Sequence, residues 1–344
     1  MLNRAKSVLD RYWPRRQSRP TPAISVIIKS YNHEKYVAET ITSVLNQTFR
    51  DFQLVITDDG SADATVDVIK GFADPRIDFV ALPINQGLSN AMNVSLRRAT
   101  GEFVAILNSD DYADPARLER QLAYLGSNPA AVAVFSEPRI VDEDGNECAL
   151  LPVFARPFSF PDFSVGTWLQ QFFLNGNCVC APSAMIRRSG YWAAGPYDRR
   201  LTNLQDLDMW IRMLASGELH VLPDRLTTFR VRANSENLSA PRPDTQLRAP
   251  FEYAQILRRF LTLDERLVRD AFAEPLAKHA ISPDLPVAQC LAELALATNT
   301  PSHRAFALET FFAAAKTDSD FARLRQVTGQ VNLFGTQIEP GATL

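Results

Sequence analysis

The chain has 344 residues, of which 46% are hydrophobic and 22% are charged, so it is long enough for about two globular domains with ordinary cores. Its net charge of -3 excludes the broad basic surface that nucleic-acid-binding domains need. The sequence has no apolar run of about 18 residues, no signal-peptide core and no CxxC pair among its four cysteines, so we expect a cytoplasmic protein without a membrane span or structural zinc.

Residues 1–21 are predicted to form a basic N-terminal arm, in which six arginines and lysines stand against one acidic residue, Asp10. Pro14 and Pro20 limit helix formation, so a solvated tail is the favoured interpretation. The alternative is peripheral contact with an anionic membrane face, because apolar residues such as Trp13 lie among the basic ones.

From residue 22, apolar strands alternate with amphipathic helices. Five short apolar runs are predicted to be strands: 24–28, 52–56, 77–80, 103–107 and 131–135. Helical spacing between them predicts helices over 35–47, 63–72, 88–99 and 116–126. This alternation predicts an α/β domain with a mostly parallel sheet that helices cover on both faces.

Polar residues directly follow three of these strands: Tyr31, Asp58 and the pair Asp110–Asp111. Ligands of open parallel sheets bind beyond the carboxyl ends of the strands, so we expect these side chains to converge. Two adjacent carboxylates need a cation, a sugar hydroxyl or an arginine partner if they are buried. The alternative for the pair is an exposed turn or helix cap, although Asp114–Pro115 can cap the next helix unaided. Asp58 can equally cap its own turn at Gly60.

A dinucleotide-binding dehydrogenase is the main competitor for such a strand pattern. It requires GxGxxG after the first strand, whereas the turn Lys29–His33 contains no glycine. A GxxxxGK[ST] phosphate loop is also absent from the sequence. The sheet is therefore predicted to bind its ligand without a glycine-rich phosphate cradle.

The remaining sequence contains fewer chemical signals. Asn175–Asn177 followed by Ala181–Ile186 is predicted to be a loop leading into a strand. A helix begins near Gln205, with Asp206 in its first turn. An aspartate in that position usually serves the helix dipole, so position alone does not assign it to catalysis. Residues 241–344 are predicted to form a mainly helical extension for packing, partner or membrane contact. The histidines have no ligand spacing and are interpreted as ordinary surface or loop residues: His33, His220, His279 and His303.

Seven segments, in this order and spacing, resemble the family 2 glycosyltransferases with the GT-A fold: Ile24–Asn32, Ser43–Thr48, Asp58–Ser61, Asn85–Gly87, Gly101–Phe103, Ser109–Asp111 and Gln205–Trp210. The resemblance covers about residues 22–238 and implies a GT-A domain over residues 22–240. It further implies transfer of a sugar from a nucleotide donor, usually a UDP-sugar, with inversion at the anomeric carbon.

The resemblance also implies roles for individual residues. Tyr31 would stack on the nucleotide base, and Asp58 would accept a hydrogen bond from it. Asp110 would contact the donor ribose or sugar, while Asp111 would bind Mg²⁺ or Mn²⁺ bridging the diphosphate. Asp206 aligns with the catalytic base that removes the acceptor proton.

Asp208 would point elsewhere on the same helix, where Arg212 is its expected partner at i+4.

Three positions depart from the family pattern. Lys29 stands where a small Thr or Ser is common, so it is expected to alter donor preference or reach a phosphate. Asn108 replaces the first aspartate of the fuller Asp-Ser-Asp-Asp form. Arg232 stands where many relatives have a histidine that completes the metal shell; it cannot ligate a cation but can neutralise a diphosphate directly.

The leading hypothesis is an inverting glycosyltransferase that acts on a glycan or lipid-linked acceptor in bacterial surface polysaccharide synthesis. Its expected partners are the nucleotide-sugar donor and this acceptor, with no nucleic acid and with peripheral contact at the inner membrane face as an option. One alternative is a non-catalytic GT-A domain that binds nucleotide-sugar or glycan. Another is a nucleotidyltransferase, which would need a glycine-rich basic loop that residues 29–34 do not supply.

Overall fold

The structure, a computed structural model, describes residues 21–148, 163–232, 236–237, 240 and 242–330. The chain divides into two compact units, one formed by Met1–Ser164 with Cys178–Pro241 and the other by Val165–Asn177 with Arg242–Leu344. The single stretch expected over 22–240 is therefore interrupted, because Val165–Asn177 group with the C-terminal helices. All but the last residue of the expected N-terminal arm lies outside the described residues.

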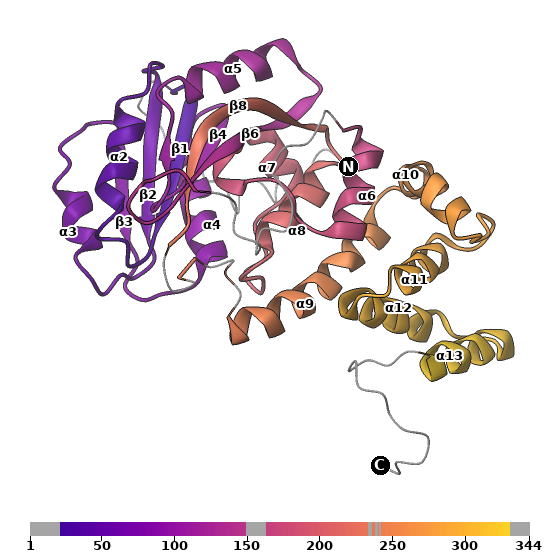
Figure 1. Cartoon of the computed structure of the whole chain (residues 1–344). Coiled ribbons are helices and arrows are strands. Elements are labelled where there is room, and N and C mark those ends of the chain that lie inside the picture. Colours follow the sequence, from indigo (N-terminus) through magenta and orange to yellow (C-terminus); the bar gives the residue numbers. More distant parts are fainter. Residues whose placement is uncertain (1–20, 149–162, 233–235, 238–239, 241, 331–344) are drawn as a thin grey trace. The chain divides into compact units, whose positions relative to one another are not determined.

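The described part of the first unit contains an eight-stranded sheet with the order β3-β2-β1-β4-β7-β6-β8-β5 (Figure 1). The strands are β1 (Ile24–Ser30), β2 (Phe52–Asp58), β3 (Ile77–Ala81), β4 (Phe103–Asn108), β5 (Tyr112–Ala113), β6 (Ala131–Val141), β7 (Met185–Arg187) and β8 (Glu218–Arg230). β1 pairs in parallel with β2 and β4, β2 with β3, and β6 with β8, while β7 and β5 are antiparallel to their neighbours. The predicted α/β fold with a mostly parallel sheet is confirmed.

The helices of this unit are α2 (Val37–Leu45), α3 (Thr65–Lys70), α4 (Leu88–Arg98), α5 (Arg117–Ser127), α7 (Arg188–Ala194) and α8 (Gln205–Met213), with a 3-10 turn at Ala181–Ser183. α5 begins two residues after Pro115, later than the sequence suggested. Asp114 Oδ1 accepts the Ala116 N–H at 2.9 Å, so this aspartate closes the turn before the helix and does not cap the helix itself.

The two faces of the sheet differ in chemistry because successive strand residues point to opposite sides. One face is a continuous apolar core in which Ile24, Val26 and Ile28 of β1 pack with residues of α2, α3 and α5. On the other face Thr57 of β2 bonds to Ser95 of α4 at 2.7 Å. Lys29 alternates with Ile28 along β1, so its side chain lies on the α4 face, where polar groups are accommodated.

The second unit is helical, as predicted. It contains α6 (Val165–Asn175), α9 (Pro243–Leu257), the 3-10 helix Arg258–Thr262, α10 (Glu265–Lys278), α11 (Val287–Thr298), α12 (Pro301–Ala314) and α13 (Asp318–Gln330). Its core surrounds the ring of Phe173 in α6, which makes edge-to-face contacts with Phe260, Phe272 and Phe306. These contacts explain why α6 belongs to this unit although the chain enters it from the first.

His303 is fully buried in this core, so its interpretation as a surface or loop residue is wrong. Its Nε2 donates to the carbonyl of Phe173 at 2.7 Å, and its Nδ1 lies 2.6 Å from the hydroxyl of Thr300.

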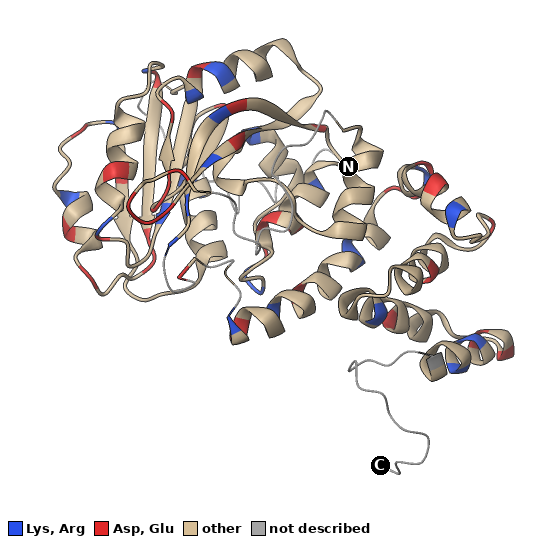
Figure 2. Ribbon diagram, in the orientation of Figure 1, with Lys and Arg blue, Asp and Glu red and all other residues tan. Residues whose placement is uncertain are grey.

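Acidic and basic residues are interspersed along both units (Figure 2), as the small net charge predicts. In the part of the chain that the structure describes, every helix is too short or too polar to cross a bilayer.

Candidate active site

The carboxyl ends of β1, β2 and β4 lie at one edge of the sheet. In the parallel register Ser30 pairs with Asp58, and Lys29 pairs with Asn108. Residues that follow these strands therefore emerge beside one another, and the predicted convergence of the strand ends is confirmed. Tyr31, directly after β1, is 45% exposed, so its ring is available to a ligand at this edge.

Asp58 is fully buried and holds the turn that follows β2. Its Oδ1 accepts the N–H groups of Gly60 and Ser61 at 3.1 and 2.9 Å. Its Oδ2 accepts the hydroxyls of Ser30 and Ser61 at 2.9 and 2.5 Å. This is the turn-capping role that the sequence left open, and it fixes the turn next to Tyr31.

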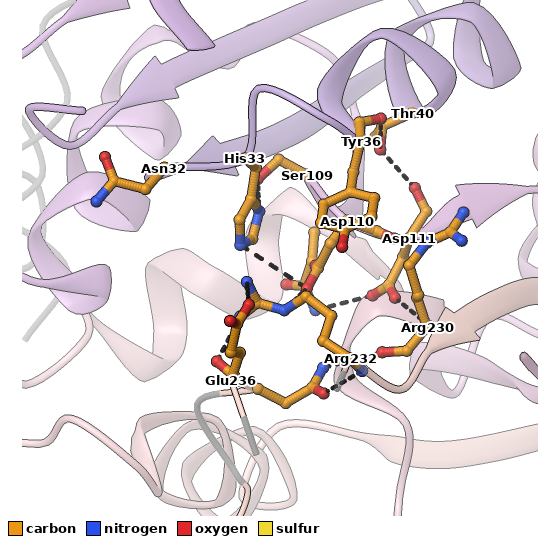
Figure 3. Close-up of polar contacts among 12 residues, drawn as sticks. Asn32, His33, Tyr36, Thr40, Ser109, Asp110, Asp111, Arg230, Arg232 and Glu236 are labelled. Carbon is orange, nitrogen blue, oxygen red and sulfur yellow. Dashed lines mark hydrogen bonds and ion pairs between the residues drawn. The ribbon is translucent and has the colours of Figure 1, made fainter. Parts of the chain in front are cut away.

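Asp110 faces two side chains from other elements (Figure 3). Its Oδ2 lies 3.2 Å from Nε of Arg232 and 3.8 Å from Nε2 of His33. The carboxylate is therefore nearly buried and paired with a guanidinium that follows β8.

His33 lies in the loop after β1, as predicted, but its side chain is part of this polar cluster. Its Nδ1 lies 2.7 Å from the hydroxyl of Ser109, and its side chain is 14% exposed. Burial lowers the pKa of His33 and the charge of Arg232 lowers it further, against the opposing effect of Asp110. The signal for its position was its place three residues after β1, at the edge where Asp110 follows β4.

Asp111 is buried beneath the cluster and joins the ends of β4 and β8. Its Oδ1 accepts the backbone N–H of Arg230 at 2.9 Å, and its Oδ2 accepts the side-chain amide of Asn108 at 2.9 Å. Burial and the neighbouring Asp110 raise the pKa of Asp111 well above its usual value. Both oxygens are thus occupied by bonds within the protein.

Arg230 holds the backbone of the two aspartates in place. It is 3% exposed, and its Nε donates to the carbonyl of Asp110 at 3.1 Å. Its other nitrogens bond to the carboxylate of Glu39 at 2.6 Å and to the carbonyl of Glu143 at 2.7 Å. Sequence reasoning missed this residue, because the pairing of β8 beside the end of β4 is not visible in the chain order.

Lys29 connects these carboxylates with Asp206. Burial lowers the pKa of Lys29 from 10.5 to about 8. The opposing effect, which favours the charged form, comes from three carboxylates and is largest for Asp206, followed by Asp111 and Asp110. The ammonium group therefore lies within electrostatic reach of all three.

Asp206 and Asp208 occupy the first turn of α8 but differ in surroundings. Asp206 is half-buried, and its Oδ1 accepts the N–H of Leu207 at 2.8 Å. Asp208 is fully buried and accepts two bonds from Arg212, at 2.7 and 3.0 Å, which confirms the predicted i+4 pair. Burial raises the pKa of Tyr197, and the charge of Asp206 raises it further, so this tyrosine lies near Asp206.

The surroundings of Asp111 bear on its predicted role as a metal ligand. Among the residues that the structure describes, no group of three or more His, Cys, Asp or Glu side chains is placed to hold a metal ion. Asp110 and Asp111 supply two carboxylates, but the first is paired with Arg232 and the second accepts two internal bonds. A divalent cation does not fit this arrangement as it stands.

The known proteins that are similar to this chain agree with the family resemblance seen in its sequence. Residues 25–193 match the model of the family described as glycosyl transferase family 2. An uncharacterized glycosyltransferase of Methanocaldococcus jannaschii is 31% identical over 224 residues, which are 63% of this chain and 74% of that protein. A chondroitin synthase of Escherichia coli is 26% identical over 65% of this chain, but the match covers only 31% of that longer enzyme.

Among solved structures, the chain resembles residues 1–349 of TarS from S. aureus in complex with UDP, with a TM-score of 0.56. The match covers 89% of this chain and 91% of that chain at 18% sequence identity. The same protein in complex with UDP-GlcNAc gives a TM-score of 0.54. At this identity the likeness concerns the fold, and it confirms the architecture that the sequence predicted.

Proposed function

Because the chain belongs to glycosyl transferase family 2, we propose that it transfers a sugar from a UDP-sugar to a hydroxyl group of a glycan or glycolipid, with inversion at the anomeric carbon. The observation that carries the proposal is the cluster at the carboxyl ends of the strands, where Asp110 lies 3.2 Å from Arg232 and the sheet register pairs Lys29 with Asn108. The charges of Asp206, Asp111 and Asp110 all favour the charged form of Lys29, which supports a single site for the predicted base and the predicted donor-binding carboxylates.

Asp206 is the proposed general base. It is half-buried in the first turn of α8, so it can face an acceptor hydroxyl while the fold fixes its position. As the acceptor oxygen attacks the anomeric carbon, Asp206 takes the hydroxyl proton. The bond from that carbon to the phosphate oxygen breaks, and its electron pair leaves with the nucleoside diphosphate.

The donor is proposed to lie over the ends of β1, β2 and β4. The exposed ring of Tyr31 would stack on the base, beside the turn that Asp58 holds. A direct bond from Asp58 to the base stays a prediction, because its oxygens already accept four donors. Asp110 would face the ribose or sugar, and Lys29 and Arg232 would face the diphosphate.

The resemblance also implies a divalent cation at Asp111, and the proposed reaction does not depend on it. When bound, Mg²⁺ or Mn²⁺ would stabilise charge on the departing diphosphate. The described carboxylates do not fit such an ion as they stand, so no step of the proposed reaction is assigned to it.

The proposed acceptor class is based on the names of proteins that are similar to this chain. Relatives include proteins named chondroitin synthase and hyaluronan synthase, which make polysaccharides. We extend this to a surface glycan or its lipid-linked precursor, met at the inner membrane face.

A donor panel tests the proposal. UDP-, GDP- and dTDP-sugars are titrated calorimetrically into the wild type and into Tyr31→Ala, and release of nucleoside diphosphate is followed. We expect one UDP-sugar to bind and be slowly hydrolysed, with affinity about tenfold weaker in the variant, since a base–aromatic stack contributes roughly 1–3 kcal/mol. Binding without turnover, even with glycan acceptors, would favour the non-catalytic alternative. Absence of binding to every nucleotide would contradict the transferase proposal and would leave only a domain that binds glycan.

A further inference from the structure

The guanidinium of Arg232 occupies a fixed position against Asp110. Nε of Arg232 lies 3.2 Å from Oδ2 of Asp110, and the two side chains are only 12% and 8% exposed. A second carboxylate, that of Glu236, lies 3.7 Å from one terminal nitrogen. The pair is therefore held where solvent screens it little.

The backbone around Arg232 is also fixed. Its N–H donates to Oδ1 of Asn237 at 2.8 Å, and the amide of Asn237 donates to the carbonyl of Arg230 at 2.9 Å. Arg230 is in turn bonded to the carbonyl of Asp110. Asp110 and Arg232 are thus tied to the same end of β8, and the ion pair is a built feature of the site (Figure 3).

We infer that Arg232 takes the place of a divalent cation at Asp110 and supplies the positive charge to which the donor diphosphate binds. This inference rests on the proposed function. The donor therefore binds without metal. The guanidinium presents five N–H donors and stays charged at any relevant pH, so it can hold Asp110 and still donate to phosphate oxygens.

The surrounding charges support this assignment. A divalent cation bound by Asp110 would lie close to a guanidinium that the fold keeps in place, and the two would repel each other. Asp111 offers such a cation only oxygens that each already accept one bond within the protein, at the ends of β4 and β8. Lys29 adds a second positive charge on the side of Asp206. Two side-chain cations can thus meet the charge that develops on the leaving diphosphate.

The test measures binding of UDP and UDP-GlcNAc by calorimetry, in chelator and with saturating Mn²⁺. Three proteins are compared: the wild type, Arg232→Gln, and Arg120→Gln as control. Arg120 is an exposed arginine of α5 paired with Asp224, outside the carboxylate cluster. Electron paramagnetic resonance of Mn²⁺ gives a second readout that does not depend on activity, and melting curves check that each variant folds.

We expect the wild type and Arg120→Gln to bind UDP with the same affinity in chelator and in Mn²⁺, and the protein to leave the Mn²⁺ spectrum unchanged. Arg232→Gln should bind about ten- to hundredfold more weakly, the cost of a lost charge-assisted contact. Binding by the wild type that requires Mn²⁺ would overturn the inference and leave the transferase proposal standing. Failure of the wild type to bind any nucleotide in either condition would count against the proposed function itself.

Discussion

Replacing an aspartate of α8 with asparagine is predicted to destabilise the protein strongly at Asp208 and only slightly at Asp206. Asp208→Asn removes the charge from a carboxylate that is 0% exposed and bonded twice to Arg212, itself 16% exposed. Removing one partner of a buried ion pair costs about 3–5 kcal/mol. Arg212 keeps its bonds to the carbonyls of Ala194 and Gly195, so we expect the lower end, about 3 kcal/mol.

For a unit of this size, such a loss lowers the melting temperature by roughly 6–12 °C. Asp206→Asn should shift it by less than about 2 °C, because Asn can still accept the Leu207 N–H and the site is half-exposed. Thermal and urea unfolding of both variants are the assays. The reasoning is refuted if Asp208→Asn leaves stability unchanged, or if Asp206→Asn destabilises the protein equally.

Further predictions concern three buried residues and one exposed glycine. Burial lowers the pKa of Lys29 to about 8, so the donor affinity measured by calorimetry should fall as the pH rises through 8. Arginine stays charged over this range, so Lys29→Arg should remove the fall in affinity. Gly101→Ala would place Cβ 2.5 Å from a backbone nitrogen of β1 and should cost about 1–3 kcal/mol in urea unfolding. Gly126→Ala in α5, where nothing lies within 4 Å, should instead stabilise by roughly 0.5–1 kcal/mol. Burial lowers the pKa of His303 below 6.5, so the unfolded chain binds a proton at this residue more readily than the folded protein does. The second unit should therefore lose stability as the pH falls below 6.5. His303→Gln should abolish this part of the loss.

The sequence predicted the parts of the molecule that depend on local pattern. β4 was found because five apolar residues, Phe103–Leu107, precede polar ones, and a strand buried on both faces requires such a run. The Asp208–Arg212 pair was found because residues four apart on a helix are neighbours. The ends of adjacent parallel strands meet at one edge, which is why the convergence near Asp110 could be predicted.

The parts that were missed depend on contacts between distant segments. His33 and His303 differ from surface histidines only through their neighbours, Asp110 in one case and the Phe173 carbonyl in the other. Arg230 approaches Asp111 because β8 pairs with β5 and β6, a register that chain order does not reveal. Residues Val165–Asn177 look like an irregular part of the first unit until their phenylalanines meet those of the C-terminal helices.

The measurement that tests the central claim most directly compares the wild type with Asp206→Asn for donor affinity and for turnover, using the UDP-sugar that binds. A proposed base acts on the acceptor and not on donor binding, so the variant should bind the donor with about the same affinity. Its release of UDP should fall by roughly 10²–10⁴-fold, the contribution of general base catalysis. Equal rates of UDP release by the two proteins, with and without glycan acceptors, would contradict the role of Asp206 and the mechanism built on it.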